Sequence, residues 1–152
     1  MVIAYDGSDV AKAAVRHAAE LFRGRRVVVV TVWEPGLALV PIGPPDQLGT
    51  IPLPPDPATV GAVDHAEQDH AERVAGEGAE LARSLGLAAE AHAVADELDV
   101  ADTVLDLARE RGAAAVVVGS HGISGLRTHL VGGVSRKLIR HSELPVVVTR
   151  DG

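Results

Sequence analysis

Short apolar stretches rich in β-branched residues alternate along this chain with longer segments of helical periodicity. The apolar stretches have the length of strands and cover residues 1–5, 27–32, 88–94, 114–118 and 146–149. The helical pattern follows Ser8, occupies residues 63–85 and 98–111, and opens again at Gly133. The stretch 27–32 is almost continuously apolar, which is typical of a strand covered by helices on both faces.

The order of these elements predicts an α/β fold. Each of the first four strands is followed by a helix, and the connections are long enough for parallel pairing. We therefore expect a three-layer, doubly wound, five-stranded parallel sheet with helices on both faces. Ser8 is suited to cap the first helix, and Gly24 is suited to end it.

Residues 34–60 interrupt the pattern. Eight of the nine prolines lie here, at positions 35, 41, 44, 45, 52, 54, 55 and 57. Proline lacks an N–H donor and fixes φ, so neither a helix nor a central strand should run through the segment. Two interpretations stay open, a surface loop and a lid over the strand ends. Neither implies a domain boundary, and we expect one domain over residues 1–152.

Composition and charge narrow the classes of function. The net charge of −7 argues against a general nucleic-acid binder, which needs a basic face. The chain has no cysteine, so disulfides and thiolate metal sites are excluded. No signal peptide and no membrane-spanning stretch of about 20 apolar residues is apparent. We therefore expect a cytoplasmic protein with no membrane partner. With only 2% aromatic residues, its core must consist of small aliphatic side chains.

A glycine-rich segment follows the fourth strand and leads into the last helix. It contains Gly119, Gly122 and Gly125, and then the pair Gly132 and Gly133. Glycine lets the backbone come close to a phosphate, and a helix starting at Gly133 would direct its unpaired N–H groups at an anion. The alternative is that these glycines only turn a long loop.

The spacing of the glycines resembles the nucleotide-binding signature of the universal stress protein family. Gly119-x-x-Gly122, nine residues and Gly132 match that signature, and L-P-V-V-V closes the chain as in the family. The opening V-I-A-Y-D-G-S is similar to the family's first strand and aspartate turn, so the resemblance covers essentially the whole chain. One position departs from it, because Gly133 replaces the usual serine or threonine and removes a hydroxyl contact to phosphate.

The resemblance implies a Rossmann-like fold of the adenine nucleotide alpha hydrolase type, with strand order 3-2-1-4-5. It also implies an adenine nucleotide, most often ATP, with Mg²⁺ or Mn²⁺ held through the phosphates and not by protein side chains. The residues expected at the nucleotide are Asp6, Val32, Gly119, His121, Gly122, Arg127, Gly132, Gly133, Val134 and Ser135. Of these, Asp6 and Val32 would contact the nucleoside, and Ser135 would partly replace the missing hydroxyl. Arg127 would either neutralise phosphate or be an ordinary solvated loop residue.

Catalysis and protein metal ligation are the weaker interpretations of the remaining polar residues. His121 could act as a general acid or base, but no lysine of a P-loop accompanies it, and we assign it to binding. His65 and Asp69 are four residues apart on one helix face, which supplies too few ligands for a metal.

Three functions therefore remain open. The first is an ATP-binding universal stress protein that acts as a regulatory, stress-response module. The second is a dimeric interaction protein of the same fold that binds no nucleotide. The third is a slow metal-dependent ATPase. By resemblance, residues 145–149 would pair with a second copy to form a homodimer.

Overall fold

The computed structural model describes residues 1–36, 57–96, 99–121 and 132–150. Five strands form one parallel sheet in the order β3-β2-β1-β4-β5. Their bounds are β1 (Val2–Ala4), β2 (Arg26–Trp33), β3 (Ala88–Ala95), β4 (Val116–Gly119) and β5 (Val146–Thr149). The sheet confirms both the predicted α/β class and the strand order 3-2-1-4-5.

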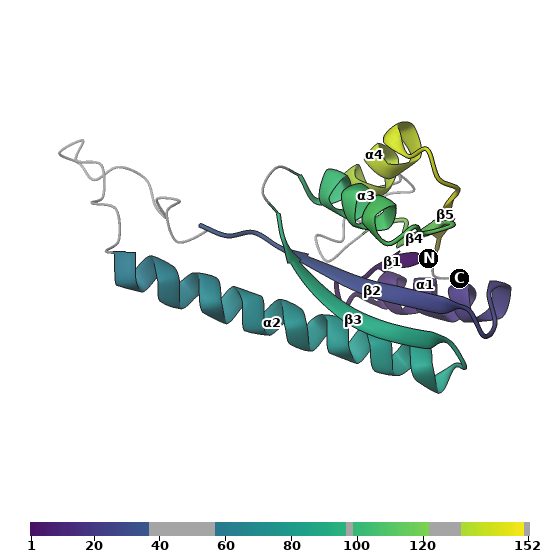
Figure 1. Ribbon diagram of the computed structural model, residues 1–152, viewed down its shortest axis with the longest axis horizontal. Helices are drawn as coiled ribbons and strands as arrows, with labels where there is room; N and C mark the ends of the chain where they lie inside the picture. The colour runs from purple at the N-terminus through teal and green to yellow at the C-terminus, as the bar shows by residue number, and fades with distance from the viewer. Residues whose placement is uncertain (37–56, 97–98, 122–131, 151–152) are drawn as a thin grey trace.

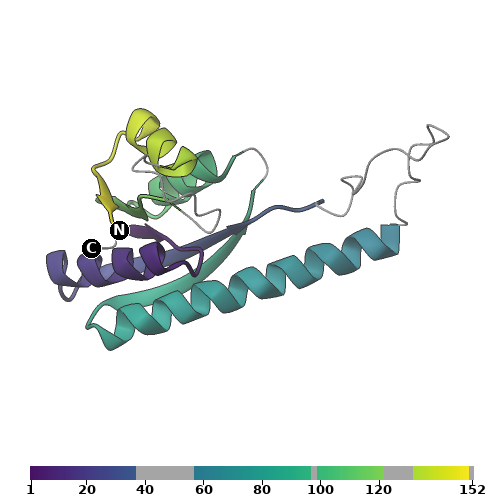
Figure 2. The same cartoon turned by 180° about the vertical axis from the view of Figure 1, so that it is seen from behind.

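Within the described residues, four helices cover the two faces of this sheet (Figure 1). Helices α1 (Asp9–Leu21) and α2 (Pro57–Ser84) lie side by side on one face, as the view from behind shows (Figure 2). Helices α3 (Val100–Glu110) and α4 (Gly133–His141) pack on the other face. The predicted three layers are therefore present.

The core consists of two apolar clusters, one on each face of the sheet. Successive residues of a strand point to opposite faces, so Ile3 joins the cluster under α1 and α2, and Val2 joins the cluster under α3 and α4. The buried helix residues of these clusters are alanine, valine and leucine, as the low aromatic content predicts. Small side chains allow the helices to lie close to the sheet. They also leave little tolerance for added volume.

The structure corrects the predicted boundaries of the proline-rich loop and the helix after it. Helix α2 begins at Pro57, six residues before the predicted start at Val63, so the loop cannot extend to residue 60. The first turn of a helix accepts proline, because its missing N–H would have no intrahelical partner there. Residues 37–56 lie outside the described residues, so the choice between a lid and a surface loop stays untested.

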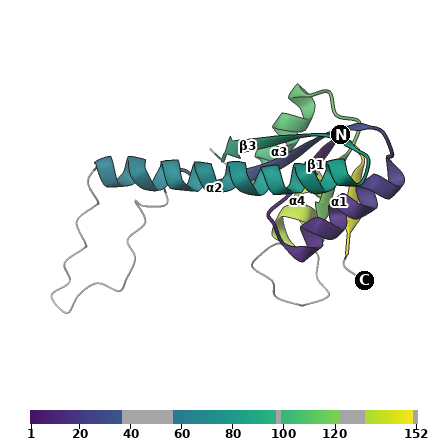
Figure 3. The ribbon, with the colours of Figure 1, turned by 90° about the horizontal axis from the view of Figure 1, so that it is seen from below.

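The first half of α2 projects beyond the sheet (Figure 3). Its buried side chains begin only at Ala71. Near its start, Asp64 Oδ1 accepts a hydrogen bond of 2.7 Å from the Gly36 N–H. Despite its length, α2 is charged along much of its surface, and no helix in the described residues is long and apolar enough to cross a membrane.

Tyr5, the residue after β1, packs against α2. The residue is 5% exposed, and burial raises the pKa of its phenol above the usual 10.0. The ring lies against Gly78, where an added Cβ would come within 2.7 Å of a ring carbon. Gly78 therefore makes room for Tyr5, which directly precedes Asp6 at the end of β1.

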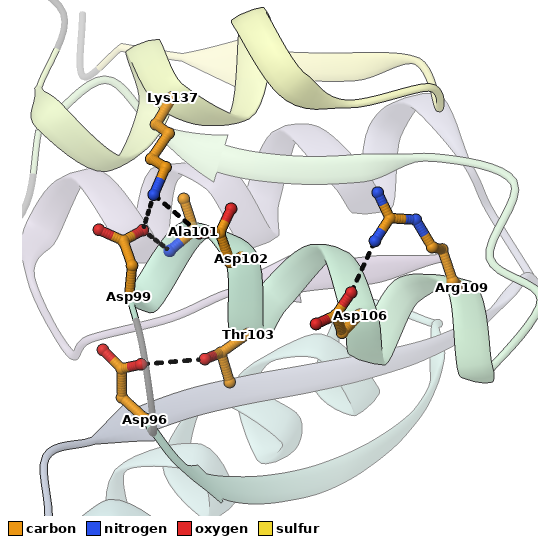
Figure 4. A network of polar contacts seen from close by, with 8 residues as sticks. All are labelled: Asp96, Asp99, Ala101, Asp102, Thr103, Asp106, Arg109 and Lys137. Atoms are coloured by element: carbon orange, nitrogen blue, oxygen red, sulfur yellow. Dashed lines mark hydrogen bonds and ion pairs between the residues drawn. The ribbon is translucent and has the colours of Figure 1, made fainter.

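One lysine joins α3 to α4 (Figure 4). The Lys137 ammonium group lies 3.0 Å from Asp99 Oδ1 and 2.8 Å from Asp102 Oδ2. Asp99 also caps α3, because its carboxylate accepts the Ala101 N–H at 2.9 Å. The pKa of Asp99 is lowered, mainly because its carboxylate accepts a hydrogen bond from Lys137. The pKa of Lys137 is raised, mainly because its ammonium group donates to Asp102. This contact joins the start of α3 to α4.

Two glycines of α2 offer a matched test of the Tyr5 contact. Alanine at Gly76 meets no atom within 4 Å, so Gly76→Ala should raise the free energy of unfolding by about 0.5–1 kcal/mol through helix propensity. Alanine at Gly78 must displace the Tyr5 ring, so Gly78→Ala should lower it by about 1–3 kcal/mol. Urea unfolding of both variants measures the difference. Equal shifts in the same direction would refute the role given to Gly78.

The Lys137 contact predicts a pH-dependent stability. The pKa of Asp99 is lower in the folded chain, so its contribution is complete above the usual value of 3.8 and disappears as the pH falls through the folded value. The pKa of Lys137 is higher in the folded chain, so its contribution is complete below 10.5 and disappears as the pH rises through the folded value. We expect Lys137→Met to lower Tm by about 1–3 °C at pH 7, because all three side chains are partly exposed.

The effect of the same substitution on Tm should shrink as the pH falls through the lowered pKa of Asp99, because the carboxylate then loses its charge. Lys12→Met is the control, since it breaks a pair in which Asp9 is 90% exposed, and its Tm should stay unchanged. An equal loss of Tm for Lys137→Met in acid and at neutral pH would show that the ion pair is not the cause.

Candidate functional site

The candidate site lies at the carboxyl ends of β1 and β4, where the chain leaves the sheet in opposite directions. The two strands are parallel neighbours. The segment after β1 leads to α1 on one face, and the segment after β4 leads to α4 on the other. Such a switch point opens a crevice beyond the strand ends, which is where open α/β sheets bind ligands.

Asp6 follows β1 in a turn that its own side chain stabilises. The Asp6 carboxylate accepts the Ser8 N–H at 3.0 Å, and Gly7 between them has φ +79°. The Ser8 hydroxyl in turn accepts the Ala11 N–H at 3.1 Å and caps α1, as predicted. The turn therefore fixes Asp6 between the end of β1 and the start of α1.

Strand β2 extends past the end of β1 and bonds to Tyr5, the residue before Asp6. The Tyr5 N–H donates to the Val30 carbonyl at 2.8 Å, and the Thr31 hydroxyl donates to the Tyr5 carbonyl at 2.9 Å. Val32 follows one residue later and is half-buried. These bonds hold the backbone near Asp6 against the end of β2.

Gly119 ends β4 at a point where no side chain fits. A Cβ there would lie 2.8 Å from Val10 Cγ1 and 3.3 Å from the Val10 carbonyl carbon. The first turn of α1 therefore packs directly on the end of β4. The next residue, Ser120, donates its N–H to the Thr149 carbonyl at 2.8 Å and so joins the same point to β5.

Gly132 brings the start of α4 back to the end of β4. Its N–H donates to the Ser120 carbonyl, and a Cβ on it would lie 3.1 Å from that oxygen and 3.2 Å from His121 Cα. The Ser135 hydroxyl, in a residue that is 2% exposed, is 3.1 Å from the Ser120 carbonyl and 3.2 Å from the Gly132 carbonyl. Ser135 therefore directs its hydroxyl into the protein at this junction.

Helix α4 differs from α1 and α3 in how its first turn is capped. Ser8 caps α1 and Asp99 caps α3, whereas the N-cap of α4 is Gly132, which has no side chain to accept a bond. The first N–H groups of a helix have no intrahelical partner. Gly133 and Val134 are exposed there, and no atom of the described residues lies within 4 Å of a Cβ built on Gly133. The start of α4 is thus suited to an anion.

His121 lies beside this junction in an arrangement suited to binding. Its Nδ1 is 3.0 Å from the hydroxyl of the neighbouring Ser120, and the side chain is half-buried. Among the residues that the structure describes, no group of three His, Asp or Glu side chains gathers to hold a metal. The contact with Ser120 orients the ring next to the start of α4 and leaves it partly open to solvent.

The structure thus gathers most of the predicted site residues at one end of the sheet. Gly119, His121 and Gly132 meet at the end of β4, Gly133 to Ser135 form the first turn of α4, and Asp6 and Val32 follow or end the neighbouring strands. Gly122 and Arg127 lie outside the described residues. Sequence reasoning missed Val10, which packs on Gly119, and Thr149, whose backbone carbonyl accepts the Ser120 N–H. No sequence motif marks either residue.

Comparisons with known proteins agree with this architecture. A sequence profile of the Universal stress protein family matches residues 1–150. Universal stress protein YxiE of Bacillus subtilis is 29% identical over 161 residues, which cover 99% of this chain and 97% of that protein.

Solved structures of similar proteins include two with bound nucleotides. A universal stress protein from Archaeoglobus fulgidus in complex with dAMP has a TM-score of 0.60 and 26% identity, covering 97% of this chain and 94% of that chain. A universal stress protein in complex with cAMP has a TM-score of 0.60 and 22% identity, covering 98% of this chain and 94% of that chain. Because the family profile spans nearly the whole sequence, the chain belongs to the universal stress protein family.

Proposed function

We propose that the protein binds an adenine nucleotide, ATP in the first place, and acts as a regulatory, stress-response module in the cytoplasm. The observation that supports this most is the uncapped start of α4, held by Gly132 at the switch point between β1 and β4. An anion there would complete the hydrogen bonds that α1 and α3 obtain from their own side chains. The dAMP bound by the Archaeoglobus fulgidus relative agrees with this class of ligand.

The described residues suggest how the nucleotide would be oriented. Its phosphates would accept hydrogen bonds from the backbone N–H groups at Gly133 and Val134, where the surface is exposed. Asp6 would bind a polar edge of the nucleoside, and the backbone near Val32 would contact the base. Mg²⁺ or Mn²⁺ would be coordinated by the phosphates and would offset their charge.

Two further residues belong to this proposal although they lie outside the described residues. Gly122 would let the backbone approach the ribose and phosphates. Arg127 would neutralise part of the phosphate charge.

Binding, and not hydrolysis, is the activity that we assign to this site. Hydrolysis would require a group placed to activate water, and the described contact of His121 is with the neighbouring Ser120 hydroxyl. Phosphate release from ATP with Mg²⁺ or Mn²⁺ should therefore stay at the level of a protein-free control. Turnover that scales with protein concentration and disappears in Asp6→Ala would establish the ATPase instead.

We also propose that β5 pairs with the β5 of a second copy. Strand β5 is at the edge of the sheet, with only β4 beside it in the described strands. The edge is apolar, because it carries three half-buried valines, Val146, Val147 and Val148. The outer edge of a sheet also offers backbone N–H and C=O groups to a partner strand.

Adjacent glycines at the start of α4 provide the test of nucleotide binding. Gly132→Ala must push against backbone atoms of Ser120 and His121, which moves the first turn of α4, so ATP affinity should fall about tenfold or more. Gly133→Ala meets no atom of the described residues within 4 Å and should bind as the wild type does. Gly133→Ser restores the family's hydroxyl and should tighten binding several-fold. Titration calorimetry with ATP and Mg²⁺ measures all three.

Two outcomes would contradict this assignment. Equal affinities of Gly132→Ala and Gly133→Ala would place the nucleotide away from α4. No binding of ATP, ADP or AMP by the wild type, together with no nucleotide released on denaturing the freshly purified protein, would support the interaction protein that binds no nucleotide.

The dimer is tested by removing one backbone donor from the free edge of β5. The Pro145 carbonyl accepts a hydrogen bond from Val116 of β4, and the Thr149 carbonyl accepts one from Ser120. In a parallel pair, every second residue of a strand directs its backbone N–H and C=O toward the same neighbour. Val148 lies between two such residues and therefore directs its N–H away from β4. Val148→Pro deletes this N–H, and light scattering at micromolar concentration should give the mass of one chain in place of two. Val148→Thr keeps the N–H and should remain a dimer. A wild-type protein that is already monomeric would refute the proposal.

A further inference from the structure

A hollow of about 960 Å³ lies at the opposite end of the sheet from the candidate nucleotide site. Its walls come from the amino ends of the strands and from the segments that follow α1 and α3. Figure 1 marks this end of the sheet with the label N. Much of the wall is small and apolar, with Ala88, Ala113 and Ala115 among the lining residues. A volume of this size is in the range of small-molecule sites.

Among the described residues, three arginines and one glutamate are the charged side chains that line this hollow. Arg25 and Arg26 come from the turn before β2 and from its first residue, and Arg111 follows α3. Arg111 pairs with Glu90 of β3. The side chains of Arg25 and Arg26 form no ion pair or hydrogen bond with any residue that the structure describes. The lining is therefore basic in a chain whose net charge is −7.

The charges of Arg25 and Arg26 act on the same part of the hollow. The Met1 amino group donates to the Arg26 carbonyl at 3.1 Å, and its pKa is lowered by burial first and then by the charges of Arg26 and Arg25. Cations at this position could have the ordinary role of interacting with the negative, carbonyl ends of the α1 and α3 dipoles. That role does not use the guanidinium donors, because Arg25 and Arg26 donate no side-chain bond within the described residues.

We propose that this basic hollow is a second binding site, for a small molecule that carries two or more phosphate groups. Each guanidinium group offers five N–H donors in a planar fork that matches phosphate oxygens. The hollow is larger than one phosphate needs, and its donors come from two separate parts of the chain. The alanines would contact the less polar part of the ligand. This site is independent of the nucleotide proposed at α4.

Inorganic pyrophosphate is the probe, titrated into the ¹⁵N-labelled full chain with sodium chloride at matched ionic strength as the reference. We expect saturable amide shifts at Ala88 to Glu90 and at Gly112 to Ala115. Amides at Gly119 and Gly132 report separately on the α4 end, so binding there is distinguished from binding in the hollow. Shifts confined to the α4 end, or shifts that sodium chloride reproduces, would overturn the proposal.

Substitution of Arg25 and Arg26 tests the donors themselves. Arg25→Gln combined with Arg26→Gln should raise the Kd of pyrophosphate in the hollow about tenfold or more, with the rest of the spectrum unchanged. Arg73→Gln is the matched control, because Arg73 lies on α2 and pairs with Glu77, and it should leave that Kd unchanged. Wild-type affinity in the double variant would overturn the proposal.

Discussion

The fold depends on close backbone contact around the end of β4. Gly119 lets the first turn of α1 reach this end, and Gly132 returns the start of α4 to it. A Cβ at Gly119 would come within 2.8 Å of Val10 Cγ1, and a Cβ at Gly132 would crowd the Ser120 carbonyl at 3.1 Å, so glycine allows both close approaches. The Ser120 carbonyl accepts from Gly132 and Ser135, and the Ser120 N–H donates to Thr149. Two helices and two strands thus meet at one short segment.

This junction relates stability to the candidate function. The Gly132 N-cap has no side chain, so the start of α4 gives up the capping bond that Ser8 provides to α1. A capped helix would be more stable by about 1 kcal/mol, but its first N–H groups would be less available to an anion. Lys137 holds α4 to the carboxylates of α3, so the helix is fixed by contacts away from its uncapped end.

The two ends of the sheet differ in the groups that they present. The carboxyl ends of the strands offer backbone N–H groups around the start of a helix, whereas the amino ends offer arginine side chains around a hollow. A parallel sheet makes this possible, because it gathers all the strand starts at one edge and all the strand ends at the other. Our hypothesis is that the carboxyl end of the sheet binds anions through backbone N–H groups and that the amino end binds them through arginine side chains.

Element order, fold class and the position of the glycine motif can all be predicted from the amino-acid sequence. Valine runs and helical periodicity are local properties, and the cap at Ser8 depends on residues within three positions of it. The start of α2 at Pro57 was missed, because proline suits a first helical turn as well as a loop. The packing of Val10 on Gly119 and the meeting of three arginines at one hollow became visible only in the folded chain. These contacts join residues far apart in the chain, and no local pattern records which side chains the packed sheet brings together.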